Sequence, residues 1–307
     1  MVVVVGFGWY LWHNRSSFEA VLEVSWPTIA GIALGIILTW VVASTQTYLM
    51  YRAEGVEIGW WENLMVALAG VLVNYLPMRL GTVVRMRYVK VVYGFGYARS
   101  VGILGIRLVL LVTATGVLGL VGTIWVWLAG GVLSFELAAI FGGLLALAAL
   151  ASFRSPSQVE SERRRHRIWN EFSSGYAAMR ERPAVTAQVL CLILMQLALV
   201  AWRFSLSLKA VGANAPVSLL VILSPATTLS NFVALVPGGL GYREAIMGYV
   251  TMATGFEFNS GLFAGTVDRA VLMVLVLILG SASFFYVWSR LPGEAPTEPP
   301  PSEPGSS

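Results

Sequence analysis

Long, predominantly apolar segments separated by short polar turns dominate the pattern of hydrophobic and polar positions along this chain. An α-helix needs about 20 mostly apolar residues to cross the hydrocarbon core of a bilayer. Segments of this length recur, which predicts an all-α, polytopic bundle of about 6–8 membrane helices. The long segments are 27–51, 101–128, 132–153, 184–208 and 262–288.

Other apolar segments are short or interrupted. Residues 60–78 run into a proline, and residues 216–236 run into a proline followed by glycines. Residues 245–254, after the second interruption, are too short to cross a bilayer alone. We therefore expect two interrupted or re-entrant segments. Residues 1–12 are also too short, and form either the end of a helix whose start is missing or a short tilted anchor.

The later interruption reads Leu-Val-Pro-Gly-Gly-Leu-Gly-Tyr-Arg-Glu over residues 235–244. It ends an uncharged run and places Arg243 and Glu244 directly after the glycines. In hydrocarbon, irregular backbone survives only where it is buried or lines a cavity, and a central charge costs about 2.5–3.5 kcal/mol. The pattern predicts a broken helix at a functional site; the alternative is a kink that only serves packing. The breaking residues are Pro237, Gly238, Gly239 and Gly241.

An earlier interruption repeats this arrangement, because Pro77 precedes Gly81 by four residues and Arg85 follows. Interrupted segments in corresponding halves are typical of transporters, whose site lies between inverted repeats. The free N–H groups of a helix start favour an anion, and arginine binds phosphate through parallel hydrogen bonds. We therefore predict that Arg79, Arg85 and Arg243 bind a lipid phosphate. For Arg79 and Arg85 the alternative is a role as anchors at the membrane surface.

Charges in the remaining apolar segments predict a buried polar network. Asp268 and Arg269 are neighbours in the last long helix and point about 100° apart, so each is expected to face a partner on another helix. Glu244 belongs to the same predicted network, with Arg243 as a candidate partner. The cations interpreted as anchors at the membrane surface are Arg87, Lys90, Arg203 and Lys209.

Composition supports a membrane protein and argues against metal or nucleotide chemistry. The chain is 57% hydrophobic and 12% charged, whereas charged residues make up about 25% of soluble domains. Cys191 is the single cysteine, and the two histidines, His13 and His166, are far apart in the sequence. No metal-ligand spacing and no GxxxxGK[ST] phosphate loop occurs, so we predict no metal, no cofactor and no ATP-driven transport within this chain.

The distribution of positive charge predicts which segments face the cytoplasm. Seven arginines lie between residues 154 and 182, so the positive-inside rule places the basic segment 152–183 in the cytoplasm. The basic residues within 79–90 are expected on the same side. Because the cytoplasmic leaflet is anionic, it explains these arginines without a nucleic-acid partner.

Residues 1–290 are predicted to form one integral membrane domain, in which 1–26 is a short or partial helix with a loop. The tail, 291–307, is rich in Pro, Glu and Ser, so we expect disorder there. The tail lies inside if residues 216–254 form a re-entrant loop, and outside if their first part crosses the membrane. The acidic loop 52–62 lies outside if the segment that follows it crosses fully.

The motifs at the two interruptions resemble those of a flippase-like integral membrane family related to the transmembrane region of lysylphosphatidylglycerol synthases. The resemblance rests on Pro-Gly-Gly-Leu-Gly-Tyr-Arg-Glu at 237–244, on Leu-Pro-Met-Arg-Leu-Gly at 76–81 followed by Arg85, and on Arg269. It extends over most of the chain, from 27 to 289. The resemblance implies a bundle with inverted-repeat character that moves a phospholipid or a lipid-linked sugar between leaflets.

The resemblance does not carry over every feature of these synthases. Their soluble aminoacyl-transferase domain is not in this sequence, so lysyl transfer is not implied and we do not expect an enzyme. The family often has an acidic residue beside the arginine of its third long helix, whereas Arg107 here follows Gly105 and Ile106.

These observations predict a lipid translocator of the plasma membrane whose partner is a membrane lipid with a phosphate headgroup. One alternative is an intramembrane glycosyl or phosphoryl transferase that acts on lipid-linked substrates. Its general base would come from Glu54, Glu57, Glu62 or Asp268, although no paired-carboxylate metal motif supports it. The other alternative is a non-transporting scaffold for a separate synthase or transferase.

Overall fold

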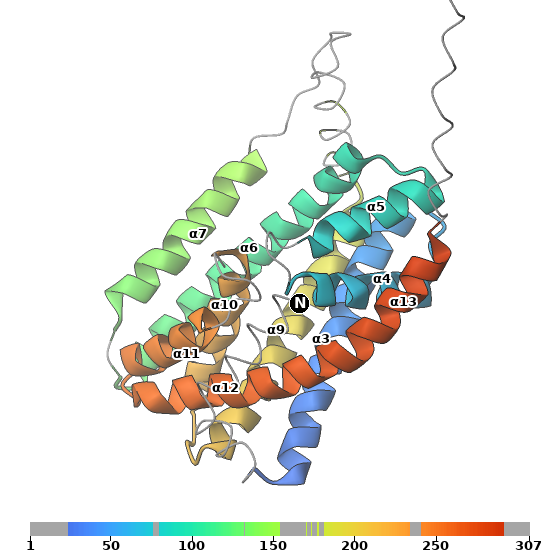
Figure 1. Cartoon of the computed structure of the whole chain (residues 1–307). Coiled ribbons are helices and arrows are strands. Elements are labelled where there is room, and N and C mark those ends of the chain that lie inside the picture. The colour runs from blue at the N-terminus through green and yellow to red at the C-terminus, as the bar shows by residue number, and fades with distance from the viewer. Residues whose placement is uncertain are drawn as a thin grey trace, which may run out of the picture.

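The chain folds into a bundle of α-helices, with no strand in the part that the structure describes (Figure 1). The predicted all-α, polytopic membrane bundle is confirmed. Four described segments are long and apolar enough to cross a membrane: α3 (Trp26–Ala53), α6 (Tyr97–Leu128), α9 (Pro183–Ala210) and Phe258–Arg290. The computed structural model describes residues 24–75, 80–131, 133–153, 181–233 and 241–291, with Asn170, Ser173 and Ala177.

The membrane-spanning segment Phe258–Arg290 is not a uniform α-helix. It consists of α12 (Phe258–Leu275), a π-helical turn at Val276–Gly280 and α13 (Ser281–Arg290). The π-helical turn packs against α4 (Trp60–Val73), where a Cβ on Gly280 would lie 3.0 Å from the Cβ of Leu72. The irregular turn therefore lies where a shorter helix crosses the last long segment.

Two pairs of shorter helices form hairpins that enter the bundle and return to the same end. In the first hairpin, Ile58 before α4 and Phe95 after α5 belong to one buried cluster. In the second, Ala215 and Ala253 pack on one cluster. The longest arm, α10, has 17 residues and rises about 26 Å, less than the hydrocarbon core of about 30 Å. The arms are α4 and α5 (Gly81–Tyr93) in the first hairpin, and α10 (Val217–Val233) and α11 (Tyr242–Ala253) in the second. The two interrupted segments are therefore re-entrant.

The hairpins enter from opposite ends of the bundle (Figure 1). Helices α3 and α9 run antiparallel, because Met50 packs near Ile193 at one end and Ile32 packs near Leu206 at the other. The first hairpin follows α3 at what we call the Ala53 end, and the second follows α9 at the Ala210 end. The order of long helix, re-entrant hairpin and long helix thus occurs twice in opposite orientations, as an inverted repeat requires.

The acidic loop between α3 and α4 lies at the same end as the basic residues after the first hairpin. Glu54 forms a 3.0 Å ion pair with Arg99, and the two carboxylate oxygens of Glu62 accept hydrogen bonds from Tyr88 (2.5 Å) and Tyr93 (2.6 Å). Burial and these hydrogen bonds raise the pKa of both tyrosine hydroxyls. Because α4 does not cross, the placement of this loop outside, opposite the basic residues 79–90, does not hold.

The last long segment also ends at the Ala53 end. Val287 of α13 packs in one buried cluster with Tyr88 of α5. The re-entrant form of residues 216–254 is therefore the one that the described chain adopts. The tail itself, 292–307, lies outside the described residues.

Small residues bring α3 and α9 together. A Cβ on Gly35 would lie 3.3 Å from the Cβ of Arg203, and a Cβ on Gly31 would lie 2.8 Å from Cδ1 of Leu206. Glycines four residues apart allow the backbones of membrane helices to approach closely. This contact brings α3 directly against the turn of α9 that carries Arg203.

Replacing Gly35 with Leu is expected to destabilise the protein by about 1–3 kcal/mol, because the added side chain overpacks the α3–α9 contact. Thermal unfolding of the purified protein in detergent measures the effect. Ala30→Leu is the matched control, since Ala30 is exposed on the same helix. A melting temperature that falls equally in both variants would contradict the specific role of the α3–α9 contact.

Candidate functional site

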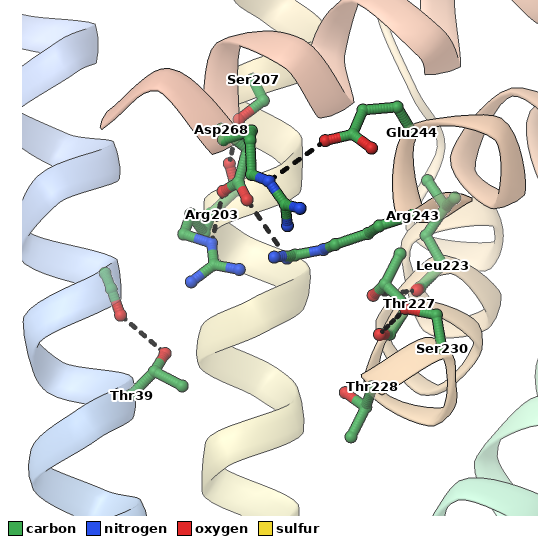
Figure 2. A network of polar contacts seen from close by, with 12 residues as sticks. Thr39, Arg203, Ser207, Leu223, Thr227, Thr228, Ser230, Arg243, Glu244 and Asp268 are labelled. Atoms are coloured by element: carbon green, nitrogen blue, oxygen red, sulfur yellow. Dashed lines mark hydrogen bonds and ion pairs between the residues drawn. The ribbon is translucent and has the colours of Figure 1, made fainter. Parts of the chain in front are cut away.

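Five charged side chains from three helices form ion pairs inside the bundle, and Figure 2 shows Arg203, Arg243, Glu244 and Asp268 among them. Asp268 of α12 pairs with two arginines: Arg203 Nε lies 2.5 Å from Oδ1, and Arg243 Nη2 lies 3.1 Å from Oδ2. Arg269 Nε of α12 lies 3.4 Å from Glu244 Oε1 of α11. All five residues are buried. We call Arg203, Arg243, Glu244, Asp268 and Arg269 the charge cluster.

The first turn of α11 directs two of these side chains to different partners. Gly241 adopts φ = +78° directly before α11, a left-handed conformation that glycine permits. Arg243 and Glu244 follow in the first turn, and adjacent residues of an α-helix point about 100° apart. Arg243 therefore reaches Asp268, while Glu244 reaches Arg269. The expected partners of Asp268 and Arg269 on other helices are present, but the candidate pairing of Glu244 with Arg243 is wrong.

The interpretation of Arg203 as a surface anchor is also wrong. Only 4% of Arg203 is exposed, and it shares Asp268 with Arg243. Helix α9 continues to Ala210, which leaves Arg203 about two turns inside the helix, while Lys209 is exposed in the last turn. The sequence did contain a signal, because Arg203 is the single charged residue between 184 and 208.

The charge cluster carries more positive than negative charge. Three guanidinium groups face two carboxylates, which leaves one positive charge in excess. The ring of Phe204 lies beneath two of the cations, with its centroid 5.3 Å from Arg203 Cζ and 5.4 Å from Arg243 Cζ. An aromatic face stabilises a cation without neutralising it. In surroundings of low dielectric constant, the excess charge favours an anionic ligand.

The tip of the first hairpin reaches the same region. Asn74 ends α4, and its Oδ1 accepts a hydrogen bond of 3.0 Å from the backbone N–H of Gly81, the first residue of α5. Tyr75 follows Asn74 and is close enough to the charge cluster to interact with it electrostatically. The first hairpin therefore extends toward the charge cluster, to which the second hairpin contributes Arg243 and Glu244. The cluster residues within this reach are Arg243, Glu244, Asp268 and Arg269.

Arg85 occupies a different place. It lies one turn into α5 and is half-buried. Within the described part of the chain, no ion pair or hydrogen bond joins Arg85 to the charge cluster. The structure thus brings together Arg243, Glu244, Asp268 and Arg269 but not Arg85. Five further predicted site residues lie outside the described residues: Pro77, Arg79, Pro237, Gly238 and Gly239.

A network of amides connects three long helices. Arg107 Nε of α6 donates a hydrogen bond of 2.9 Å to Gln46 Oε1 of α3. Gln46 Nε2 in turn donates to Gln196 Oε1 of α9 at 2.8 Å. Sequence reasoning did not assign either glutamine, although each is a strongly polar residue within a spanning segment. A neutral amide therefore contacts Arg107.

No metal centre is present among the described residues, since no three His, Cys, Asp or Glu side chains are grouped there. Cys191, the single cysteine, is exposed on α9.

Comparison with known families places this chain in one of them. The family model described as the lysylphosphatidylglycerol synthase TM region matches residues 1–280. The chain belongs to this family. Membership fits a membrane protein with a role related to lipids, and the family match includes both hairpins and the entire charge cluster. No curated protein and no solved structure matches the chain.

Proposed function

We propose that this protein moves a phospholipid with an anionic headgroup, or a lipid-linked sugar, between the two leaflets of the membrane. The observation that carries the proposal is the buried charge cluster with its excess positive charge: the second re-entrant hairpin contributes two of its residues, and the oppositely oriented first hairpin extends toward it. Discontinuous helices of this kind form the substrate sites of transporters built from inverted repeats. Membership in a family named for the synthesis of a lipid supports a lipid substrate.

Arg243 is the residue we assign to the lipid phosphate. The exposed fraction of its side chain is 11%, against 5% for Arg203 and 4% for Arg269. It also lies in the first turn of α11, where backbone N–H groups add a partial positive charge. In the proposed cycle the phosphate binds Arg243, while Asp268 retains its ion pair with Arg203. The carboxylate thus keeps a partner at every stage.

The proposed path lets the headgroup pass the hairpin tips while the acyl chains remain in the hydrocarbon core. Contact with arginines lowers the cost of moving a charged headgroup through surroundings of low dielectric constant. Rocking of one repeat against the other would expose the charge cluster alternately to the Ala53 end and the Ala210 end. We place the Ala53 end on the cytoplasmic side of the plasma membrane. The basic segment 152–183 connects the end of α7 (Phe135–Phe153) to the start of α9, and this connection lies at the Ala53 end.

The transferase alternative is less well supported. A general base needs a carboxylate whose lone pairs can accept a substrate proton. Glu54 is paired with Arg99, Glu62 accepts two tyrosine hydroxyl groups, and Asp268 holds two arginines. Three of the four candidate bases therefore have strong partners.

Lipid exchange in proteoliposomes tests the proposal. Protein is reconstituted with a headgroup-labelled phosphatidylglycerol, and dithionite reports how fast the label reaches the outer leaflet. Arg243→Gln is expected to slow this exchange about 10- to 100-fold, since one charge-assisted hydrogen bond contributes about 1.5–3 kcal/mol. Lys209→Gln is the control, because it removes an equal charge from an exposed position.

Two results would count against the proposal in different ways. Equal exchange by wild type and Arg243→Gln would remove the charge cluster from the path but leave translocation intact. No exchange by wild type with phosphatidylglycerol, phosphatidylcholine or a polyprenyl phosphate, with and without an ion gradient, would overturn translocation. Product formation from a lipid-linked sugar donor would then favour the transferase.

A further inference from the structure

Two arginines near the Ala53 end lie close together without a carboxylate between them. Arg85 of α5 and Arg107 of α6 are close enough to repel each other electrostatically. Val89, one turn after Arg85, and Ile103, one turn before Arg107, pack in the same buried cluster. Among the described residues, no ion pair involves either guanidinium. This differs from the charge cluster, where two carboxylates offset three arginines.

Buried polar atoms lie beside this arginine pair. The Nε of Arg85 is buried and has no hydrogen-bond partner among the described residues, and the buried hydroxyl groups of Tyr51 and Ser100 lie next to each other. Tyr51 and Ser100 are each 0% exposed. Tyr51 lies near both Ser100 and Arg85, and it packs in the same cluster as Val89. Buried polar groups in native proteins are nearly always paired, so the unpaired Nε of Arg85 beside these hydroxyl groups indicates a missing acceptor.

Arg107 is held in position by neutral groups. Its Nε donates to Gln46, which is itself held by Gln196 at 2.8 Å. A carboxylate in place of Gln46 would neutralise Arg107, whereas the amide fixes the guanidinium and leaves its charge uncompensated. Because buried unpaired charges are costly, such an arrangement is stable only if an anion binds there or if solvent reaches it. Both arginines are half-buried, so an anion can approach them.

We propose that Arg85, Arg107, Tyr51 and Ser100 form a second anion site, which binds the phosphate of a lipid with a net negative headgroup. The site lies in the first repeat, on the side of the bundle toward the Ala53 end, and is separate from the charge cluster. It extends the proposed function, because it gives the lipid one binding position in each repeat. The absence of a carboxylate among its described residues favours an anionic headgroup, such as phosphatidylglycerol, over zwitterionic phosphatidylcholine.

Native mass spectrometry of the full chain tests this site without requiring translocation. The purified protein is incubated with equal amounts of phosphatidylglycerol and phosphatidylcholine, and the bound lipids are counted. Wild type is expected to retain phosphatidylglycerol preferentially. Arg85→Gln with Arg107→Gln is expected to lower that retention at least about tenfold, as the loss of two charge-assisted contacts implies. Lys90→Gln is the control, because it removes an exposed charge from the same helix, α5. The Nζ of Lys90 lies 4.4 Å from the centroid of the Tyr97 ring.

A second variant guards against misfolding of the double substitution. Tyr51→Phe removes one hydroxyl group and keeps the ring, which packs edge-on to Phe95 with centroids 5.9 Å apart. It is expected to lower phosphatidylglycerol retention about threefold to tenfold while the melting temperature stays near that of wild type. The double glutamine variant is expected to melt at or above the wild-type temperature, because it removes two cations that repel each other.

The outcomes separate the site from the proposed function. Equal retention of both lipids by wild type, or unchanged phosphatidylglycerol retention in the double glutamine and Tyr51→Phe variants, would overturn the site. Displacement of the lipid by millimolar inorganic phosphate would assign it to a free anion instead of a headgroup. Selective retention that depends on Arg85 and Arg107, together with no lipid exchange in proteoliposomes, would support the site and overturn translocation.

Discussion

Replacing Asp268 with Asn is expected to destabilise this protein by about 3–5 kcal/mol, the cost of removing one partner from a buried ion pair. Asp268 is 1% exposed and is the carboxylate shared by Arg203 and Arg243. Asparagine has nearly the same shape but no charge, so the substitution leaves both guanidiniums buried without a counter-ion. The effect should exceed that of losing either arginine alone, since each arginine leaves Asp268 with one remaining partner.

Thermal or denaturant unfolding in detergent measures this loss. Glu257→Gln is the matched control, because it removes one acidic charge from the exposed residue directly before α12. Adding Arg203→Met to Asp268→Asn is expected to restore part of the stability, since one of the two unpaired cations is then absent. If Asp268→Asn and Glu257→Gln unfold alike, the charge cluster does not have the buried, coupled character inferred for it.

Replacing Gly81 with Ala is expected to disrupt the first hairpin and to abolish lipid exchange. A Cβ at this position would lie 1.9 Å from the carbonyl oxygen of Gly70 and 2.5 Å from Oδ1 of Asn74. Overpacking costs about 1–3 kcal/mol where side chains can yield, and more where the obstacle is backbone. The substitution also disturbs the hydrogen bond that the backbone N–H of Gly81 donates to Asn74 Oδ1, next to Tyr75, which lies within electrostatic reach of the charge cluster.

Unfolding measurements and the proteoliposome assay together test this prediction. Gly142→Ala is the control, because Gly142 lies within α7 and an added Cβ would meet no atom within 4 Å. This control is expected to be neutral or slightly stabilising, as alanine is in a helix interior. Wild-type stability and exchange rates in Gly81→Ala would show that the two arms of the hairpin do not pack as closely as inferred.

Much of the architecture could be predicted from local sequence. Segment 101–128 is uncharged over most of a bilayer thickness, and the structure has α6 at Tyr97–Leu128. Gly81 and Gly241 mark the start of the second arm of each hairpin, because glycine allows close approach in one case and left-handed backbone in the other. These features depend on hydrophobic length and backbone freedom, which are properties of short stretches of chain.

Sidedness was harder to predict. The acidic loop 52–62 could be placed only by deciding whether the segment after it crosses the membrane. Helix α4 has 14 residues, and whether such a helix spans or returns depends on the second arm packed against it. The contact between Gly70 and Gly81 decides this point, and that contact joins positions in two different helices.

The sequence by itself therefore determined four long membrane-spanning segments, the two interruptions and the presence of charges beside them, whereas the helix within the fifth predicted segment, 132–153, is shorter than expected. Only the tertiary structure decided which charges meet. Adjacent Arg243 and Glu244 diverge to different partners, and Arg203 joins them from a helix in which it looked like an anchor. The physical reason is that the partner of a buried charge is set by the angle and depth at which helices pack, and these depend on contacts between residues far apart in the chain.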